Sequence, residues 1–381
     1  MNTKHKTIAI LVLVMSLVMS GCGPGQLLGP TFTSTPTFTL TPTTTITPTF
    51  TPQPTLTFTP SPIPTPLRTL YFPYAGVNLA GADFGEGTLP GTYNSDYTYP
   101  TTAEMDYFIS KGMTIFRLPF RWERLQQAQL ADFDANEQQR IDTVVNYATN
   151  KGAYVLLDPH NYARYYGKII GESAVPITAF ADFWSRLAGR YRSNNRVIFG
   201  LMNEPNTMST ELWVSDANAA IQAIRATGAT NLILVPGNGW DGAAGWGQDW
   251  YGTPNASALL GIKDPGNNYA FEAHQYLDSD GSGSHDTCVS STIGSDRMAF
   301  FTRWLRQNKM RGFLGEFGSS ANNTCLAALD DILTRLEKNS DVYIGWTYWA
   351  AGPWWGNYMF SIEPAGGIDS LQMEVLSRHL P

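Results

Sequence analysis

Short apolar runs that end in polar residues recur along the chain, and the clearest of them is Val197–Met202. Five of these six residues are apolar, Gly200 being the exception, and the run stops at Asn203-Glu204-Pro205. A continuous apolar run between turn residues is typical of a strand buried on both faces. Pro205 cannot donate a hydrogen bond to a sheet and biases Glu204 away from helical geometry. The pattern therefore predicts a carboxylate at the point where a core strand leaves its sheet.

Runs of the same kind predict eight strands, and the seventh, Gly312–Glu316, also ends in a carboxylate. The others are Tyr74–Leu79, Thr114–Pro119, Tyr154–Asp158, Val197–Met202, Leu232–Val235, Tyr269–His274 and Tyr343–Tyr348. Amphipathic stretches between the strands predict helices over Thr101–Lys111, Asp134–Asn150, Thr178–Tyr191, Thr210–Thr227, Ser295–Lys309, Cys325–Lys338 and Ser370–His379, with a short one near Ala256–Leu260.

Local signals support these helices. The first begins like a capping box on Thr102, with Glu104 and Asp106 in its first turn. Eight strand–helix units over about 310 residues predict an α/β fold, the (β/α)8 TIM barrel. A doubly wound open sheet is the alternative, but polar residues spread over many strand ends favour the barrel.

The N-terminus has the features of a targeting segment. Lys4 and Lys6 precede an apolar run, Ile8–Met19, which suits a signal peptide and is too short for an ordinary membrane span. Ser20-Gly21-Cys22 then resembles a bacterial lipobox. We expect a lipoprotein-type signal peptide over residues 1–21 and lipidation of Cys22, which would tether a bacterial cell-surface protein; ordinary secretion is the alternative.

Residues 22–70 form a predicted linker dominated by Thr and Pro, with Arg68 as its only charged residue. Such a composition cannot build a core and favours extended conformations, so we expect this segment to be disordered. The catalytic domain is then expected over residues 71–381.

Charge and cysteine content narrow the possible partners. The net charge of -7 argues against nucleic acid or anionic lipid as the main partner and suits a neutral substrate. With Cys22 lipidated, Cys288 and Cys325 remain as a pair, most simply a disulfide in an exported chain. His285 is the only loose candidate for a metal ligand near Cys288. We expect a monomer without a cofactor or metal.

Polar side chains follow most of the predicted strands. A lone Arg or His at a strand end is as often a structural hydrogen bonder as a functional group, but in a closed barrel all of these residues would face one bowl. They are Arg117, His160, Asn161, Asn203, Glu204, His274, Tyr276, Glu316 and Trp349.

These motifs, in this order, resemble glycoside hydrolase family 5, and the region around His274–Asp280 is most similar to its endo-β-1,4-glucanase (cellulase) branch. The resemblance covers Tyr74 to about Pro364. It implies a retaining enzyme with Glu204 as acid/base and Glu316 as nucleophile. It also implies that Asn203 binds the 2-hydroxyl of the reacting sugar, and it places Cys288 and Cys325 where that branch carries a disulfide.

The chemistry sets conditions on the two carboxylates. Retention requires them about 5–5.5 Å apart. Glu316 must be ionised, which Arg117 and a hydrogen bond from Tyr276 would favour. Glu204 must first be protonated, so we expect its pKa to be raised by burial and by the charge of Glu316.

Aromatic residues near strand ends suggest sugar platforms, because indole packs against the apolar face of a pyranose ring. Trp349 is the expected floor under the reacting sugar. The fifth loop carries Trp240, Trp246, Trp250 and Tyr251, and the eighth carries Trp354 and Trp355. The alternative is that these residues pack the loops, and we expect about half of them to contact substrate.

The main hypothesis is therefore an exported endo-β-1,4-glucanase acting on cellulose and related β-glucans. A β-mannanase or xyloglucanase on the same scaffold, and a catalytically silent glycan-binding surface lipoprotein, are the alternatives. A metal site at His160 and His274 is a further, weaker one. We interpret the remaining carboxylates as loop or supporting groups: Asp83, Glu86, Glu123, Asp158 and Glu272.

Overall fold

The computed structural model describes residues 71–381. The predicted signal peptide, the lipidation site at Cys22 and the Thr/Pro-rich linker lie outside the described residues, and the proposed domain boundaries remain predictions. Among the residues that the structure describes, no helix combines the length and apolar character needed to cross a membrane.

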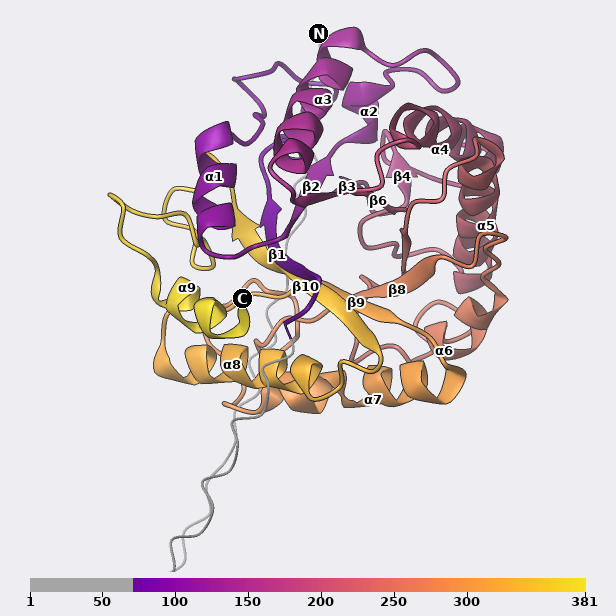
Figure 1. Cartoon of the computed structure of the whole chain (residues 1–381). Helices are drawn as coiled ribbons and strands as arrows, with labels where there is room; N and C mark the ends of the chain where they lie inside the picture. Colours follow the sequence, from indigo (N-terminus) through magenta and orange to yellow (C-terminus); the bar gives the residue numbers. More distant parts are fainter. Residues whose placement is uncertain (1–70) are drawn as a thin grey trace, which may run out of the picture. The chain divides into compact units, whose positions relative to one another are not determined.

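Eight parallel strands close into a barrel in the order β1-β10-β9-β8-β7-β6-β3-β2 (Figure 1). This confirms the TIM barrel and excludes the open sheet, since β1 pairs with both β2 and β10. The barrel strands are β1 (Tyr74–Leu79), β2 (Ile115–Phe120), β3 (Tyr154–Pro159), β6 (Val197–Gly200), β7 (Ile233–Pro236), β8 (Tyr269–His274), β9 (Gly312–Glu316) and β10 (Tyr343–Ala351).

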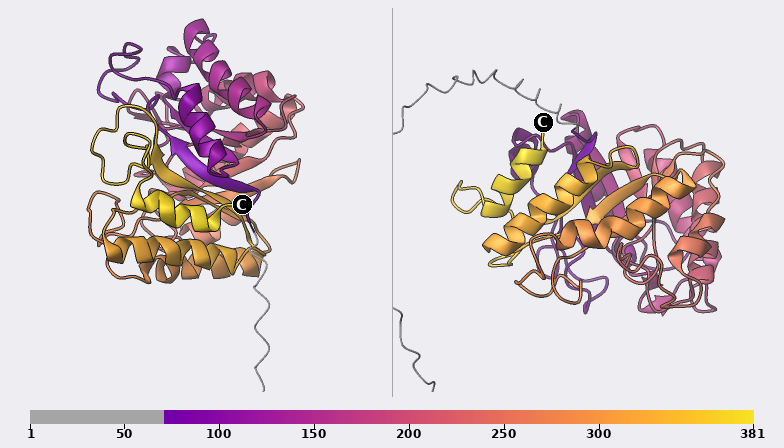
Figure 2. Two further views of the ribbon diagram at one scale, coloured as in Figure 1. Left: turned by 60° about the vertical axis from the view of Figure 1, so that its left-hand side comes forward. Right: turned by 90° about the horizontal axis from the view of Figure 1, so that it is seen from below.

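Helices form a layer outside these strands (Figure 2). They are α1 (Thr102–Ser110), α2 (Trp122–Leu125), α3 (Ala135–Asn150), α4 (Ile177–Tyr191), α5 (Thr210–Ala226), α6 (Asn255–Ala258), α7 (Ile293–Asn308), α8 (Asn323–Glu337) and α9 (Leu371–Leu376), with short 3-10 turns at Leu259–Gly261 and Ser377–His379. Neither α2 nor the small hairpin of β4 (Arg164–Tyr165) and β5 (Lys168–Ile169) was predicted.

The helix starts follow from short side chains that bind free backbone N–H groups. Thr101, rather than Thr102, caps α1, and Glu104 completes the capping box. The predicted cap was one residue late because the box requires an acid three residues after the cap, and Glu104 stands in that relation to Thr101. Asp134 caps α3 by accepting hydrogen bonds from two backbone N–H groups.

The lower part of the barrel is filled by apolar side chains, which reach inward from six neighbouring strands. They form one buried cluster: Ile115, Leu156, Ile198, Leu234, Ala270 and Phe313. A second, larger apolar core includes buried residues of both strands and helices, among them Val155, Phe199, Trp184 and Ile221. With the bottom of the barrel sealed, polar side chains gather at the carboxyl ends of the strands.

The predicted disulfide is formed. Cys288 lies in the loop after β8, Cys325 lies in the first turn of α8, and their Cα atoms are 5.2 Å apart. The bond therefore fastens a loop beside the barrel mouth to the helix layer.

Candidate active site

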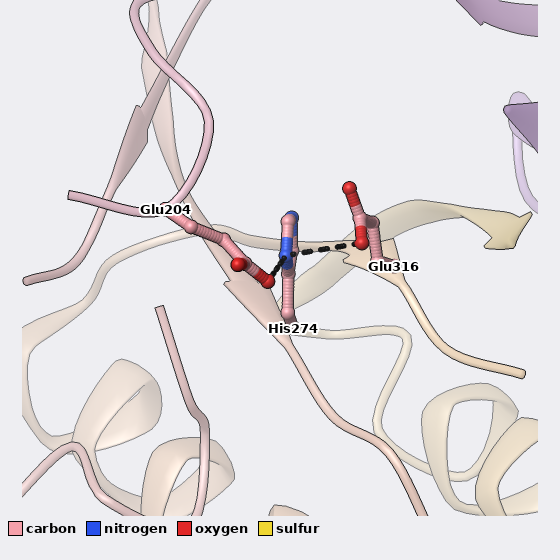
Figure 3. A group of neighbouring side chains, drawn as sticks. All are labelled: Glu204, His274 and Glu316. Carbon is pink, nitrogen blue, oxygen red and sulfur yellow. Dashed lines mark hydrogen bonds and ion pairs between the residues drawn. The ribbon is translucent and has the colours of Figure 1, made fainter. Parts of the chain in front are cut away.

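The two strand-end carboxylates meet at the barrel mouth. Glu316 is the last residue of β9, and Glu204 follows four residues after β6. Three atoms lie within 4.8 Å of one another: one carboxylate oxygen of Glu204, one carboxylate oxygen of Glu316 and a ring nitrogen of His274 (Figure 3). This separation agrees with the short carboxyl–carboxyl distance of retaining glycosidases and not with the roughly 6.5–9.5 Å of inverting ones.

The backbone at Glu204 is strained. Its φ of 41° lies in the left-handed region that side-chain-bearing residues rarely adopt. The conformation is held locally, since the Asn206 side chain donates to the Glu204 carbonyl over 3.0 Å. Strain of this kind persists where the surrounding structure enforces it, commonly at functional sites.

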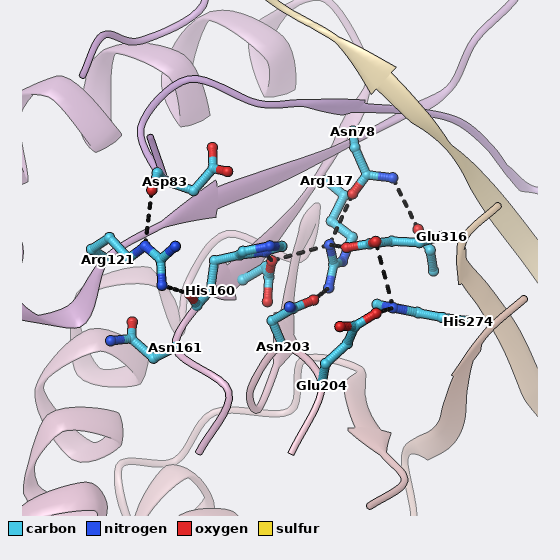
Figure 4. Close-up of polar contacts among 12 residues, drawn as sticks. Asn78, Asp83, Arg117, Arg121, His160, Asn161, Asn203, Glu204, His274 and Glu316 are labelled. Atoms are coloured by element: carbon cyan, nitrogen blue, oxygen red, sulfur yellow. Dashed lines mark hydrogen bonds and ion pairs between the residues drawn. The ribbon is translucent and has the colours of Figure 1, made fainter. Parts of the chain in front are cut away.

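Arg117 lies at the centre of the polar contacts beneath the two carboxylates (Figure 4). It is fully buried, and the carboxylates around it outweigh burial and hold its pKa above the usual value. Its guanidinium donates to Glu316 Oε1 (2.8 Å), Asn203 Oδ1 (2.9 Å) and Asn78 Oδ1 (2.9 Å) and forms ion pairs with Glu272 (3.0 Å) and Asp158 (3.1 Å).

Glu316 receives both of the contacts expected for it. Arg117 donates to Oε1, and the Tyr276 hydroxyl donates to Oε2, each over 2.8 Å. Burial, followed by the charge of Glu316, raises the pKa of Tyr276 well above its usual value, so this hydroxyl keeps its proton. Two donors on one carboxylate stabilise its ionised form.

Glu204 lies in a different environment, with 16% of its side chain exposed against 4% for Glu316. Burial raises the pKa of Glu204, the hydrogen bond from His274 lowers it, and the charge of Glu316 raises it, with a net increase. The two carboxylates thus have unlike surroundings, and a raised pKa at Glu204 suits the role of an acid.

His274 lies between Glu204 and Glu316. Its Nδ1 lies 2.8 Å from Glu204 Oε1 and 3.6 Å from Glu316 Oε2. Burial lowers the pKa of His274, but the charges of Glu316 and Glu204 outweigh burial and raise the pKa well above its usual value. The two carboxylates therefore favour the protonated form of the ring that lies between them.

His160 and Asn161, both predicted to serve the site, take separate positions. His160 Nδ1 lies 2.7 Å from Asp158, its ring stacks on Trp349 with centroids 5.4 Å apart, and burial lowers its pKa to about 3. Asn161 instead donates to Glu123 over 2.6 Å and accepts from a backbone N–H of α2. Asn161 therefore supports the loop after β3 rather than the two carboxylates.

Two buried residues at the site were missed or undervalued by sequence reasoning. Asn78, in β1, donates to Gly315 O over 2.9 Å and accepts from Arg117. Glu272, in β8, was interpreted as a supporting group although it contacts Arg117 directly. The available signal was a polar residue inside each of two otherwise apolar strands.

A cavity of about 720 Å³ opens beside Glu204. Trp240 and Trp250 line it and are 43% and 60% exposed. The prediction that Trp246 is a sugar platform is wrong. Its side chain is fully buried against Phe301 and Trp304. The Gly-rich loop folds back and inserts this one indole into the core.

The eighth loop divides in a similar way. Trp354 is 51% exposed, whereas Trp355 is half-buried. Trp355 packs on Phe84 and Tyr358 at centroid distances of 4.9 and 4.3 Å and donates to Ala351 O. Trp355 therefore packs the loop, and Trp354 remains accessible.

Two groups of three side chains have spacing compatible with a metal ion in residues 71–381. One is Glu204, His274 and Glu316, and the other is Asp278, Asp280 and His285. Neither contains both His160 and His274, so the described structure does not assemble the two-histidine site. His274 already directs Nδ1 at Glu204 as a hydrogen-bond partner.

Comparison with known proteins agrees with this geometry. Residues 77–352 match the family model described as Cellulase (glycosyl hydrolase family 5). The chain belongs to glycosyl hydrolase family 5. It is therefore a glycoside hydrolase by family, and the match includes every predicted site residue from Arg117 to Trp349 but not Trp354 or Trp355.

Two curated relatives from fungi are similar to this chain. The chain is 46% identical over 298 residues to Endoglucanase gh5-1 of Neurospora crassa, covering 78% of this chain and 74% of that protein. It is 47% identical over 300 residues to Endo-beta-1,4-glucanase A of Emericella nidulans, covering 78% and 89%.

Solved family 5 structures are also similar. XacCel5A in complex with cellopentaose shares 50% identity at a TM-score of 0.80, covering 81% of this chain and 99% of that chain. The endo-beta-1,4-glucanase Xac0029 from Xanthomonas axonopodis pv. citri shares 50% identity at a TM-score of 0.79, covering 80% and 98%.

Proposed function

We propose that this chain is an endo-β-1,4-glucanase that cleaves internal bonds of cellulose and related β-glucans by double displacement. The observation that carries the proposal is the pair Glu204 and Glu316, with oxygens within 4.8 Å and unlike surroundings. The names of the relatives support the substrate class, since three of them are named endoglucanase or endo-β-1,4-glucanase and XacCel5A was solved with cellopentaose.

In the first step, a Glu316 oxygen attacks the anomeric carbon while the bond from that carbon to the leaving glycosidic oxygen breaks. Glu204 donates its proton to that oxygen. The product is a glycosyl ester on Glu316. The charge of Glu316 is consumed in this ester, so one cause of the raised Glu204 pKa disappears.

In the second step, Glu204 accepts a proton from water as the water oxygen attacks the same carbon, and the ester bond to Glu316 breaks. Two inversions give net retention. The lowered proton affinity of Glu204 after the first step suits its change from acid to base.

Asn203 is oriented to bind the reacting sugar. It is 1% exposed, and its Oδ1 accepts from Arg117 over 2.9 Å, which fixes the orientation of the amide. Among residues 71–381, its Nδ2 has no hydrogen-bond partner. An unpaired buried donor is costly, and a sugar hydroxyl would satisfy it.

Aromatic rings near the two carboxylates supply candidate surfaces for sugars. We assign the floor under the reacting sugar to Trp349, which stacks against His160. Trp240 and Trp250 line the cavity that includes Glu204, where successive sugars of a chain would pack. Trp354 is a further exposed candidate.

A substrate panel with product analysis tests the proposal. Soluble carboxymethylcellulose, lichenan, mannan and xyloglucan are compared side by side, and the first-formed anomer is followed by NMR. We expect turnover of carboxymethylcellulose and lichenan with β-product first. Preferred turnover of mannan or xyloglucan would replace the substrate assignment, and binding without turnover would identify a silent glycan-binding protein.

We further infer that the protein is exported and held at the cell surface by lipid on Cys22, with free secretion as the alternative. The basic residues, apolar run and Cys22 of the N-terminal sequence support this. Cys22→Ala should move the protein from the membrane fraction to the soluble exported fraction. Unchanged fractionation would count against lipidation.

A further inference from the structure

Glu272 is an acidic residue enclosed by the barrel below the two proposed catalytic carboxylates. It lies in β8 two residues before His274, so both side chains point to the same face of the strand. Glu272 is 1% exposed. Burying an ionised carboxylate costs free energy unless partners compensate for its charge, so the partners of Glu272 indicate its role.

The partners of Glu272 are the two cations of the site. Its Oε1 lies 3.0 Å from Arg117 Nε and 3.5 Å from His274 Nε2. Each cation in turn holds one carboxylate, Arg117 binding Glu316 and His274 binding Glu204, both over 2.8 Å. Oε1 of Glu272 thus contacts both Arg117 and His274, the two residues that hold Glu316 and Glu204.

The barrel wall leaves space for this carboxylate. Gly315 precedes Glu316 in β9, and a Cβ atom at position 315 would lie 2.1 Å from Glu272 Oε1. Gly200 in β6 lies on the other side, where a Cβ atom would be 3.7 Å from Oε2. Any side chain at position 315 would displace Glu272 from its contact with Arg117.

Glu272 is also the ionised group facing His274 Nε2. Burial raises the pKa of Glu272, but Arg117 and His274 outweigh it and bring the pKa below the usual value. Asp241 lies 3.8 Å from the same Nε2, but burial raises its pKa well above the usual value, which favours its neutral form. Glu204 and Glu316 face the opposite ring nitrogen.

We propose that Glu272 is a positioning residue for the glucanase reaction, which anchors Arg117 and His274 from below and keeps His274 charged and oriented toward Glu204. The inference rests on the proposed function of Glu204 and Glu316. Glu272 does not touch substrate in this account; it acts through the two cations.

Glu272→Gln is the direct test because it keeps the shape of the side chain and removes its charge. Asp216→Asn is the matched control: Asp216 in α5 is equally buried and neither of its oxygens has a hydrogen-bond partner within residues 71–381. The titration of the His274 ring is followed by NMR with ¹⁵N-labelled histidine, and kcat and KM are measured on carboxymethylcellulose.

In Glu272→Gln, we expect the acid dissociation constant of the His274 ring to rise about tenfold or more. The kcat should fall about 10- to 100-fold with KM within about threefold, because support is lost mainly in the transition state. Asp216→Asn should leave both readouts unchanged. An unchanged His274 titration or kcat in Glu272→Gln, or equal losses in Asp216→Asn, would overturn the proposal.

The wild-type ring provides a test that does not depend on the folding of a variant. His274 should carry protons on both nitrogens at pH 7, and a neutral ring would overturn the proposal. Failure of the proposed function would instead appear as absent wild-type turnover on all four polysaccharides, a result that the NMR readout does not involve.

Discussion

His274 and Glu204 are 70 positions apart in the sequence, yet His274 Nδ1 lies 2.8 Å from Glu204 Oε1. The contact forms because β8 ends at His274 while the chain after β6 turns Glu204 into the mouth of the barrel. The contact with His274 lowers the pKa of Glu204, the proposed acid/base.

His274→Gln should shift the pH profile. Glu204 must be protonated to act as an acid, so activity falls as pH rises through its pKa. The His274 contact lowers that pKa, and its removal should therefore raise the pKa and move the alkaline limb of kcat/KM to higher pH. The kcat should also fall about 10- to 100-fold.

The control for this profile is His285→Gln, since the His285 side chain is 52% exposed and contacts Asp278 rather than either carboxylate. It should reproduce the wild-type profile. An alkaline limb that stays in place in His274→Gln would show that His274 does not influence the acid.

Trp246 and Trp250 should respond oppositely to truncation. Trp246→Ala removes a fully buried indole and should lower the free energy of unfolding by about 3–5 kcal/mol. Trp250→Ala should leave unfolding unchanged and raise KM for cellohexaose about 3- to 10-fold, through loss of one aromatic platform. Urea unfolding and steady-state kinetics on both variants check this; a KM effect confined to Trp246→Ala would reverse the assignment.

Asp216 should make stability depend on pH. Burial raises its pKa from 3.8 to about 7. Between these values the folded protein binds a proton that the unfolded chain releases, so stability falls as pH rises through this window. Relative to wild type, Asp216→Asn should gain about 2–3 kcal/mol between pH 5 and pH 8. Urea unfolding at both pH values measures this, and a pH-independent difference would contradict it.

The disulfide should contribute to stability without serving the chemistry. It closes a sequence separation of 37 residues, which corresponds to about 4 kcal/mol on the chain-entropy model. Cys288→Ser with Cys325→Ser should lower the free energy of unfolding by up to that amount while kcat at 25 °C stays within about twofold. A large loss of kcat in the folded variant would show that the loop after β8 depends on the bond for its catalytic geometry.

The sequence was sufficient to predict the barrel because its strands are buried on both faces and read as continuous apolar runs. β1, β8 and β9 have the predicted bounds. The same runs located Glu204 and Glu316, since Glu316 ends one run and Glu204 stands two residues after another. The hairpin of β4 and β5 was missed because strands of two residues leave no periodic pattern.

Other features depend on contacts between distant segments. Glu272 and Asn78 gain their importance from Arg117, which a single-strand pattern does not reveal. Trp246 and Trp250 stand in one Gly-rich loop, and only the folded loop separates the core indole from the exposed one. Asn161 supports the loop after β3 because it donates a hydrogen bond to Glu123 in α2.

Trapping the glycosyl–enzyme intermediate tests the central claim most directly. A 2-deoxy-2-fluoro-cellobiosyl fluoride forms the ester quickly but slows its hydrolysis, and peptide mass spectrometry locates the modified residue. We predict one added fluorocellobiosyl group, on Glu316, and none in Glu316→Gln. An adduct on Glu204 or any other residue, or release of α-product without an adduct, would contradict the account.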